Sequence, residues 1–396
     1  MKHPERKLAK RLDYPGRSRQ FTDEVYSGVG SKDEKWARAQ ASDQPYLPPA
    51  SPYSLFVGDL HGHTDLSDGG VDIDTYFRSL RDRVQVDFAA LTDHDHGGVG
   101  KKELWDGAWD QIREKVREYY EPGKFTTILG YERDSYPYYN NMVLYYAGDT
   151  GEMVRGVHDG EITERELRAL LKRGDILAVP HDTYSLDAGA DFLRLSPALF
   201  TPMIELYSRG DACEYFGNPA FAAPTACEGG FWRDALERGA KMGCIGASDD
   251  HTGRNGLTVP EFGYPRMYPG LTGVWAEENT REAIFAALKA KRTFAFMGGR
   301  MSIDFRVSDH FMGESFSAAP GEDVRIWFRV SADQPVKQIT VIKNGRDLVQ
   351  FNRDLTQVFF DNCRERKTDY YYLRVELTDG RFGWSSPVWV EKGKRK

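Results

Sequence analysis

The sequence is poor in cysteine and has no long hydrophobic run. The 396-residue chain contains four cysteines, which are scattered and form no Cys-x-x-Cys pair. This pattern argues against a disulfide framework and against a thiolate metal site. No apolar segment approaches the ~18 residues of a membrane span, and no apolar stretch follows the basic N-terminus as in a secretory signal. The sequence therefore predicts a cytoplasmic protein that does not insert into a membrane.

Long stretches of one charge sign are also missing. The net charge is −7, with acidic and basic residues interspersed, which does not suit an extended nucleic-acid surface. The sequence has no G-x-S-x-G elbow, no Walker loop and no G-x-G-x-x-G after a predicted strand. These absences argue against a serine hydrolase, an NTPase and a dehydrogenase. We expect a small-molecule substrate and no nucleic-acid partner, and the sequence leaves the oligomeric state open.

Three regions follow one another along the chain. Residues 1–52 are polar and rich in turn residues, and we expect an irregular lead-in. From 53 to 300, short apolar runs alternate with helical patterns, one of which begins with the capping box Thr163-x-x-Glu166. This alternation predicts an α/β fold with a mainly parallel sheet, closed as a barrel or a wound sheet.

The pattern changes near residue 300. Segments such as MSIDFRV, VRIWFRV and KQITVIKNG alternate apolar and polar residues with a period of two. The dipeptides Asn344-Gly345 and Asp379-Gly380 are typical of tight hairpin turns. We therefore expect residues 301–396 to form a small antiparallel β-sandwich.

Histidines and carboxylates gather where the strands predicted between 53 and 300 end. Six of the nine histidines lie in clusters that read DLHGH (59–63), TDHDH (92–96), GYERD (130–134), PHD (180–182) and SDDH (248–251). The carboxyl ends of parallel barrel strands converge on one face. Imidazole and carboxylate together suit zinc, manganese or iron, and cations would offset so many carboxylates. The sequence therefore predicts a pocket for one to three divalent transition-metal ions.

In their order along the chain, the motifs DLHGHTDLSDG, LTDHDH, GYE, VPH and ASDDH resemble those of the PHP phosphoesterases, the polymerase and histidinol phosphatase superfamily. The resemblance covers roughly residues 54–300. The chain beyond it is similar to a subgroup with an added C-terminal β domain. The resemblance implies a distorted (β/α)7 barrel that holds up to three metal ions in its mouth.

The resemblance also implies the ligands. Residues at the strand ends would hold the ions, namely His61, His63 and Asp249 the first, Glu132 as a bridge to the second, His181 the second, and Asp68, His94 and His251 the third. Asp93 would orient a ligand or a neighbouring strand, and Glu205 is a further candidate ligand. Related sequences often have a histidine soon after the bridging glutamate, where this chain has Asn140 and Asn141. We therefore expect an altered second site.

These residues predict a metal-dependent hydrolase that attacks a phosphomonoester or phosphodiester with a metal-bound hydroxide. Asp182 and His96 are candidates for proton transfer to the leaving group. Arg254 is a candidate for binding a phosphate or a carboxylate. The sequence leaves two alternatives open. One is a metal-dependent hydrolase of carboxyl esters, carbamates or amides, and the other is a non-catalytic protein that binds metals or a ligand such as a carbohydrate.

Overall fold

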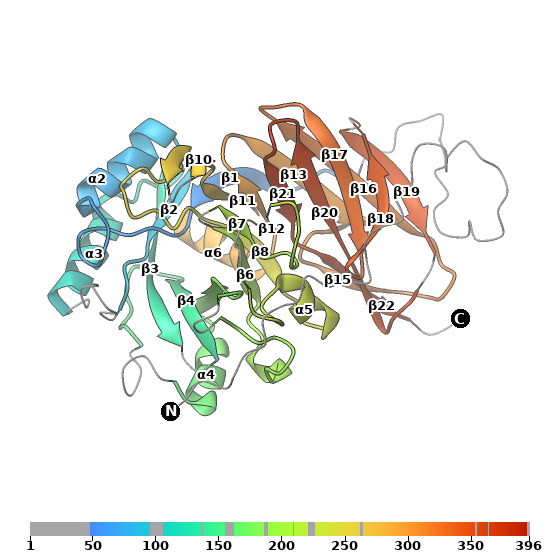
Figure 1. The fold of residues 1–396 in the computed structure, drawn as a ribbon, viewed down its shortest axis with the longest axis horizontal. Helices are drawn as coiled ribbons and strands as arrows, with labels where there is room; N and C mark the ends of the chain where they lie inside the picture. The colour runs from blue at the N-terminus through green and yellow to red at the C-terminus, as the bar shows by residue number, and fades with distance from the viewer. Residues whose placement is uncertain are drawn as a thin grey trace.

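The fold is described from a computed structural model (Figure 1). It describes residues 48–95, 106–135, 138–154, 162–185, 189–208, 210–220, 226–261, 264–352, 355–362 and 364–393. The predicted lead-in up to residue 47 and the candidate His96 lie outside these ranges. None of the helices in the described ranges is long and apolar enough to cross a membrane.

Two sets of parallel strands lie in the first part of the fold. β1 (Ser54–Asp59), β2 (Phe88–Leu91) and β3 (Thr126–Ser135) pair in parallel. β6 (Met203–Ser208) and β8 (Gly243–Gly246) form a second parallel pair. β1, β2 and β8 end at or just before one of the histidine and carboxylate clusters, whereas the GYERD cluster lies within β3 and Glu205 lies within β6.

Antiparallel strands flank the β1–β2–β3 set on both sides. β4 (Tyr139–Tyr146) pairs antiparallel with β3 and with β5 (Ile176–His181). On the other side, β11 (Gly270–Ala276) pairs antiparallel with β1 and with β12 (Thr293–Met297). The sheet is therefore mixed, and not mainly parallel as the alternating pattern predicts. The difference arises because β3 returns directly as β4, without the helical crossover that a parallel pair requires.

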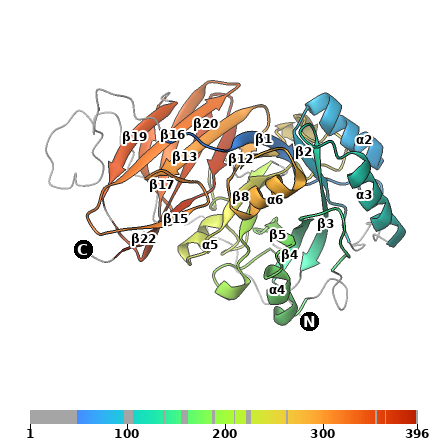
Figure 2. The same cartoon turned by 180° about the vertical axis from the view of Figure 1, so that it is seen from behind.

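Helices cover the outside of these strands, with α2 and α3 together at the end far from the C-terminal strands (Figures 1 and 2). Thr163 and Glu166 form the predicted capping box at the start of α4. The helical segments are α2 (Ile73–Arg78), a π-helix (Ser79–Val84), α3 (Asp106–Glu118), α4 (Glu164–Leu171), a 3-10 helix (Pro197–Leu199), α5 (Trp232–Glu237) and α6 (Arg281–Lys289).

The strands after residue 300 form two further layers. One sheet contains β14 (His310–Phe311), β13 (Met301–Val307), β16 (Val324–Ala332) and β19 (Thr356–Asp361). The other layer contains β15 (Ser315–Ala318), β17 (Val336–Lys343), β18 (Arg346–Phe351), β20 (Thr368–Leu377), β21 (Phe382–Ser385) and β22 (Val388–Lys392). Short strands β7 (Asp211–Ala212), β9 (Val259–Glu261) and β10 (Tyr264–Met267) complete the fold.

The large sheet continues across residue 300. β21 pairs antiparallel with β12, so the C-terminal strands extend the sheet that contains β1. A buried carboxylate adds to this junction. Glu214, which follows β7, accepts hydrogen bonds from the Tyr372 hydroxyl at 2.7 Å and the Trp384 indole at 2.9 Å, and pairs with Arg374 at 2.9 Å. The two parts of the chain are therefore joined by both a strand ladder and a buried ion pair.

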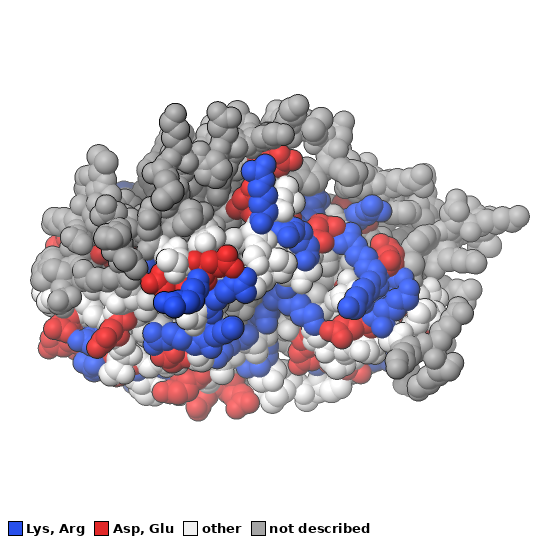
Figure 3. Space-filling view, turned by 90° about the horizontal axis from the view of Figure 1, so that it is seen from below, with Lys and Arg blue, Asp and Glu red and all other residues white. Residues whose placement is uncertain are grey.

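Apolar side chains fill the space that the strands enclose. One buried cluster joins Ile128 of β3, Val179 of β5 and Ile245 of β8 with Ile284 and Leu288 of α6. Each of these three strands carries its polar cluster a few residues beyond the apolar position. The polar strand ends thus lie next to a dry core. In the face shown in Figure 3, Lys and Arg lie beside Asp and Glu, so neither sign dominates that surface.

Candidate metal centre

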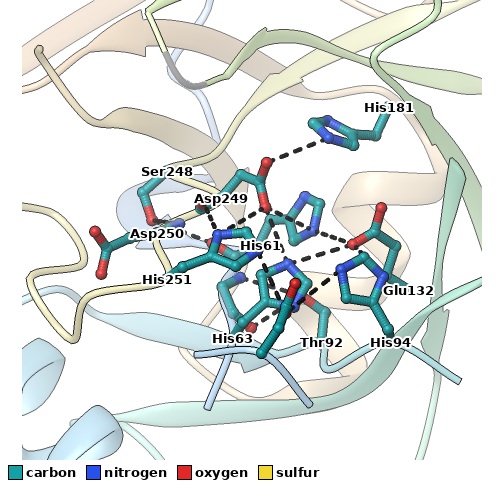
Figure 4. Close-up of polar contacts among 12 residues, drawn as sticks. His61, His63, Thr92, His94, Glu132, His181, Ser248, Asp249, Asp250 and His251 are labelled. Atoms are coloured by element: carbon teal, nitrogen blue, oxygen red, sulfur yellow. Dashed lines mark hydrogen bonds and ion pairs between the residues drawn. The ribbon is translucent and has the colours of Figure 1, made fainter. Parts of the chain in front are cut away.

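Backbone contacts hold the ends of distant strands side by side. The Asp249 amide donates to the His61 carbonyl at 3.0 Å, and the His63 amide donates to the Asp250 carbonyl at 3.0 Å. Backbone hydrogen bonds therefore join the residues after β1 to the segment after β8. Likewise, His94 and Glu132 form an isolated parallel bridge beyond β2 and β3. These pairings bring the histidine and carboxylate clusters into one place (Figure 4).

Four buried side chains form the centre of the site. Glu132 Oε2 lies 3.2 Å from His61 Nε2 and 3.3 Å from His63 Nε2. Asp249 Oδ1 lies 3.4 Å and 3.0 Å from the same two nitrogens. Suitable ligand atoms of all four residues lie within 4.8 Å of one another. This group brings together the three residues predicted for the first ion and the predicted bridging glutamate.

A second group shares His63 and lies closer to the surface. Asp68 Oδ1 lies 3.6 Å from His63 Nδ1, 3.6 Å from His94 Nε2 and 3.4 Å from His251 Nε2. His251 Nδ1 lies 3.0 Å from the Asp249 carbonyl, which can only accept a hydrogen bond. In a neutral ring this contact places the proton on Nδ1, so that the lone pair of Nε2 points toward Asp68. This group contains the three residues predicted for the third ion.

His181 lies on the other side of Asp249. Its Nε2 lies 3.3 Å from Asp249 Oδ2 and 3.4 Å from Asp182 Oδ2, while its Nδ1 lies 2.8 Å from Glu205 Oε1. Asn141, which was expected at an altered second site, pairs with His181 across the β4–β5 ladder. In this arrangement Asp249 spans the His61/His63 side and the His181 side.

These residues fit divalent metal ions. An imidazole nitrogen and a carboxylate oxygen bound to one zinc ion at about 2.0–2.2 Å would lie roughly 3.0–3.4 Å apart, as many of these pairs do. Glu132 Oε2 also has a third imidazole nitrogen, His94 Nδ1, at 3.2 Å. Two buried atoms, Glu132 Oε1 and His63 Nδ1, have no hydrogen-bond partner among the described residues. Such atoms are readily explained as ligands of ions.

The electrostatics of the site favour positive charge. Burial alone would lower the pKa of His61, but Glu205, Asp249 and Glu132 outweigh it and raise that pKa to about 10. Hydrogen bonds to Asp249 and Glu132 likewise overcome burial and raise the pKa of His63 to about 9. Without ions, the carboxylates therefore hold protons on histidines that are normally neutral at pH 7. A cation would supply the same charge.

Two residues around the centre hold its loops. Asp93 accepts hydrogen bonds from the Thr64 amide and hydroxyl at 2.8 and 2.6 Å and from the Ser67 hydroxyl. It thereby fixes the loop that carries Asp68, and among the described residues its side-chain hydrogen bonds go to this loop and not to an imidazole. Asp250 accepts from the backbone amides of Thr252 and Arg254, which shapes the loop after His251.

Two of the candidate catalytic residues, Asp182 and Arg254, lie among the described residues. Asp182 is partly exposed and has a left-handed backbone, with φ 48°. Arg254 is exposed, and its Nε donates to the Thr252 hydroxyl at 3.0 Å. His96 lies outside the described residues.

Sequence reasoning underestimated two residues. Asp249 was expected at one ion, yet its two oxygens face different histidines. Glu205 was considered only as a candidate ligand, yet both of its oxygens contact imidazoles. The available signal was a carboxylate within the apolar segment IELY, which forms part of the buried strand β6.

Comparisons with known proteins give distant likenesses. A family described as a protein of unknown function, DUF3604, matches residues 258–324. An uncharacterized protein of Chlamydia pneumoniae is 25% identical over 367 residues, covering 85% of this chain and 57% of that protein. One of Chlamydia muridarum is 25% identical over 385 residues, covering 86% and 58%. The chain therefore spans a little more than half the length of these relatives.

A solved structure from Bacteroides vulgatus is also similar. It is described as a two-domain protein containing a predicted PHP-like metal-dependent phosphoesterase. It is 16% identical, covers 89% of this chain and 100% of that chain, and has a TM-score of 0.46. A likeness of this size carries no argument about chemistry, which has to come from the geometry of the site.

Proposed function

We propose that the protein is a metal-dependent hydrolase whose substrate is a phosphoester. One observation carries the proposal, namely that His61, His63, Glu132 and Asp249 meet in a buried group although His63 and Asp249 are 186 residues apart in the sequence. Neutral imidazoles and carboxylates in such a group are ligands for zinc, manganese or iron. Bound there, such ions would supply an activated water and would neutralise the charge of a phosphoryl group.

The site has an open side, which favours catalysis over a structural role. The side chains of His251 and Asp68 are 18% and 19% exposed, whereas those of His61 and Glu132 are 0% and 1% exposed. Structural metal sites are usually closed and rich in cysteine. The described cysteines, Cys213, Cys227 and Cys244, are buried and none belongs to a ligand group. A substrate would therefore approach from the Asp68–His251 side.

Asp182 and Arg254 supply the remaining roles of the proposal. Asp182 lies beside His181 and is partly exposed, so its carboxyl group is placed to give a proton to a leaving group. Arg254 follows His251 in an exposed loop and has terminal guanidinium nitrogens with which to bind an anionic oxygen. The assignment of Arg254 fits a phosphoester better than a neutral amide, since an exposed arginine gains most from an anionic substrate.

The test is metal analysis paired with substrate assays. The purified full chain should contain bound transition metal, and reconstitution with manganese, zinc or iron should give hydrolysis of nitrophenyl phosphate or its phosphodiester. Nitrophenyl acetate is assayed in parallel. Faster hydrolysis of the acetate than of either phosphate would favour the carboxyl ester alternative. Less than about half an equivalent of metal, with no activity after reconstitution, would overturn the enzyme proposal.

A further inference from the structure

The carboxylate of Glu205 contacts the Nδ1 atoms of two histidines, His61 and His181. It lies in β6 and is fully buried. Its Oε1 lies 2.8 Å from His181 Nδ1, and its Oε2 lies 3.0 Å from His61 Nδ1. The two rings are nearly perpendicular, with centroids 4.7 Å apart and an interplanar angle of 82°. A single carboxylate therefore contacts both imidazole rings, with one oxygen at each Nδ1.

The chemistry of the contact determines the tautomers. An ionised carboxylate can only accept hydrogen bonds, so the ring nitrogen that faces it must carry the proton. His61 and His181 are therefore both protonated on Nδ1. In the neutral rings this leaves an unprotonated Nε2, and each Nε2 faces Asp249, at 3.4 Å from Oδ1 for His61 and 3.3 Å from Oδ2 for His181.

Unprotonated nitrogens facing carboxylate oxygens repel one another unless a cation lies between them. The same tautomers that satisfy Glu205 thus create two places, one at each oxygen of Asp249, where a cation would be stabilised. A neutral imidazole has only one lone pair for an ion. If Glu205, His61 and His181 shared an ion, His61 would bind that ion through Nδ1 and a second ion through Nε2. The proton that Nδ1 donates to Glu205 precludes this.

We propose that Glu205 is a positioning residue, and not a metal ligand, which sets the tautomer and the direction of both His61 and His181 so that two ions can share Asp249. The inference rests on the proposed metal-dependent function. Carboxylates that accept from the other nitrogen of a ligating histidine make the ring more basic and hold its orientation. Glu205 performs this role for two histidines in different parts of the site.

The local structure holds Glu205 in place. The pairing of β6 with β8 shifts register between Glu205 and Tyr207, which marks an irregularity directly after Glu205. Bulges of this kind re-aim side chains near active sites. Cys213 also holds the backbone at this point of β6. Its amide donates to the Leu206 carbonyl at 2.8 Å, and its thiol contacts the Glu205 carbonyl at 3.4 Å.

The test compares Glu205→Gln with Asp68→Asn in the full chain. The amide of Glu205→Gln can accept from one histidine but offers an N–H to the other, which disfavours the ligating tautomer of that ring. We expect this variant to bind as many ions as the wild type at saturating metal, with affinity about 10–100-fold weaker for the affected ion. Asp68→Asn removes a proposed ligand and should lose an ion at saturation.

Metal content by elemental analysis and cobalt titration followed by absorption provide readouts that are independent of turnover. Loss of one equivalent from Glu205→Gln at saturating metal, or unchanged affinity for every ion, would overturn the inference. If the amide variant does not fold, Glu205→Asp serves instead, since it keeps the charge but retreats by one methylene and should also weaken binding without loss of stoichiometry. A wild type that binds no metal would instead refute the proposed function.

Discussion

Asp249 Oδ2 lies 3.3 Å from His181 Nε2, while the other oxygen of the same carboxylate lies 3.0 Å from His63 Nε2. Asp249 also has a left-handed backbone, with φ 49°, a conformation that aspartate tolerates better than most residues. The carboxylate is thus held between two sets of histidines, and changes at this position should affect both.

Asp249→Asn should remove metal from both sides of the site. The amide keeps the shape but loses the charge that attracts cations, so we expect metal content to fall by at least one equivalent and turnover to fall by about 100-fold or more. Elemental analysis and nitrophenyl phosphate kinetics measure both effects. Asp65→Asn is the matched control, because Asp65 follows His63 closely in the chain, is exposed and belongs to none of the ligand groups. Full metal content in Asp249→Asn would contradict the site.

His61→Ala should lose metal and activity while the fold is retained. His61 belongs to the group with His63, Glu132 and Asp249 and is fully buried, so its removal takes away a proposed ligand and leaves Glu132 and Asp249 less well compensated. Far-UV circular dichroism should stay close to wild type. The prediction fails if the variant keeps wild-type turnover at limiting metal.

After removal of metal, the stability of the protein should fall as the pH is raised from neutral to alkaline. In the folded metal-free protein the pKa values of His61 and His63 are raised to about 10 and 9, against 6.5 for an ordinary histidine. Because the folded state binds these protons more tightly, their contribution to stability is complete below pH 6.5 and is lost as pH rises to about 10. The melting temperature of the chelator-treated protein should therefore fall over this range.

The metal-loaded protein is the comparison for this experiment. Metal binding displaces the protons and becomes stronger as pH rises toward neutrality and beyond. The difference in melting temperature between loaded and stripped protein should therefore widen with pH. A constant difference from pH 6.5 to 10 would argue against ions at these histidines.

Asp182→Asn should act on the leaving group. If Asp182 gives the proton, substrates with a poor leaving group such as an alkyl alcohol should lose about 100-fold or more in kcat. Nitrophenyl esters should lose much less, because nitrophenolate leaves without a proton. Elemental analysis of the variant separates this role from metal binding, since Asp182 lies 3.4 Å from His181 Nε2. Equal losses on both substrate types would exclude the general-acid role.

Glu214→Gln should destabilise the junction between the two parts of the chain. Its carboxylate is buried and pairs with Arg374, whose side chain is 12% exposed, so loss of the charge leaves the guanidinium poorly compensated. We expect a loss of roughly 3 kcal/mol in the free energy of unfolding. Glu391→Gln is the control, because Glu391 pairs with Lys241 on the surface, and surface pairs contribute only about 0–1 kcal/mol. Denaturant unfolding followed by tryptophan fluorescence measures both variants.

Much of the fold follows from local patterns. The capping box at Thr163 and Glu166, the period-two strands after residue 300 and the turn at Asn344 and Gly345 are all present. Both turn residues have positive φ, at 50° and 73°, as the dipeptide predicts. The antiparallel return of β3 into β4 was not anticipated, because strand direction depends on which neighbour a strand finds and not on its own pattern.

By itself, the sequence determined which residues are suited to bind metals and that they follow strand ends, because residue chemistry and strand periodicity are local properties. Only the tertiary structure decided which nitrogen faces which oxygen. Asp249 lies between His63 and His181, and Glu205 lies behind His61 and His181, because packing sets the register and direction of strands that are far apart in the chain. Those relations convert a set of candidate ligands into a centre with defined tautomers and shared carboxylates.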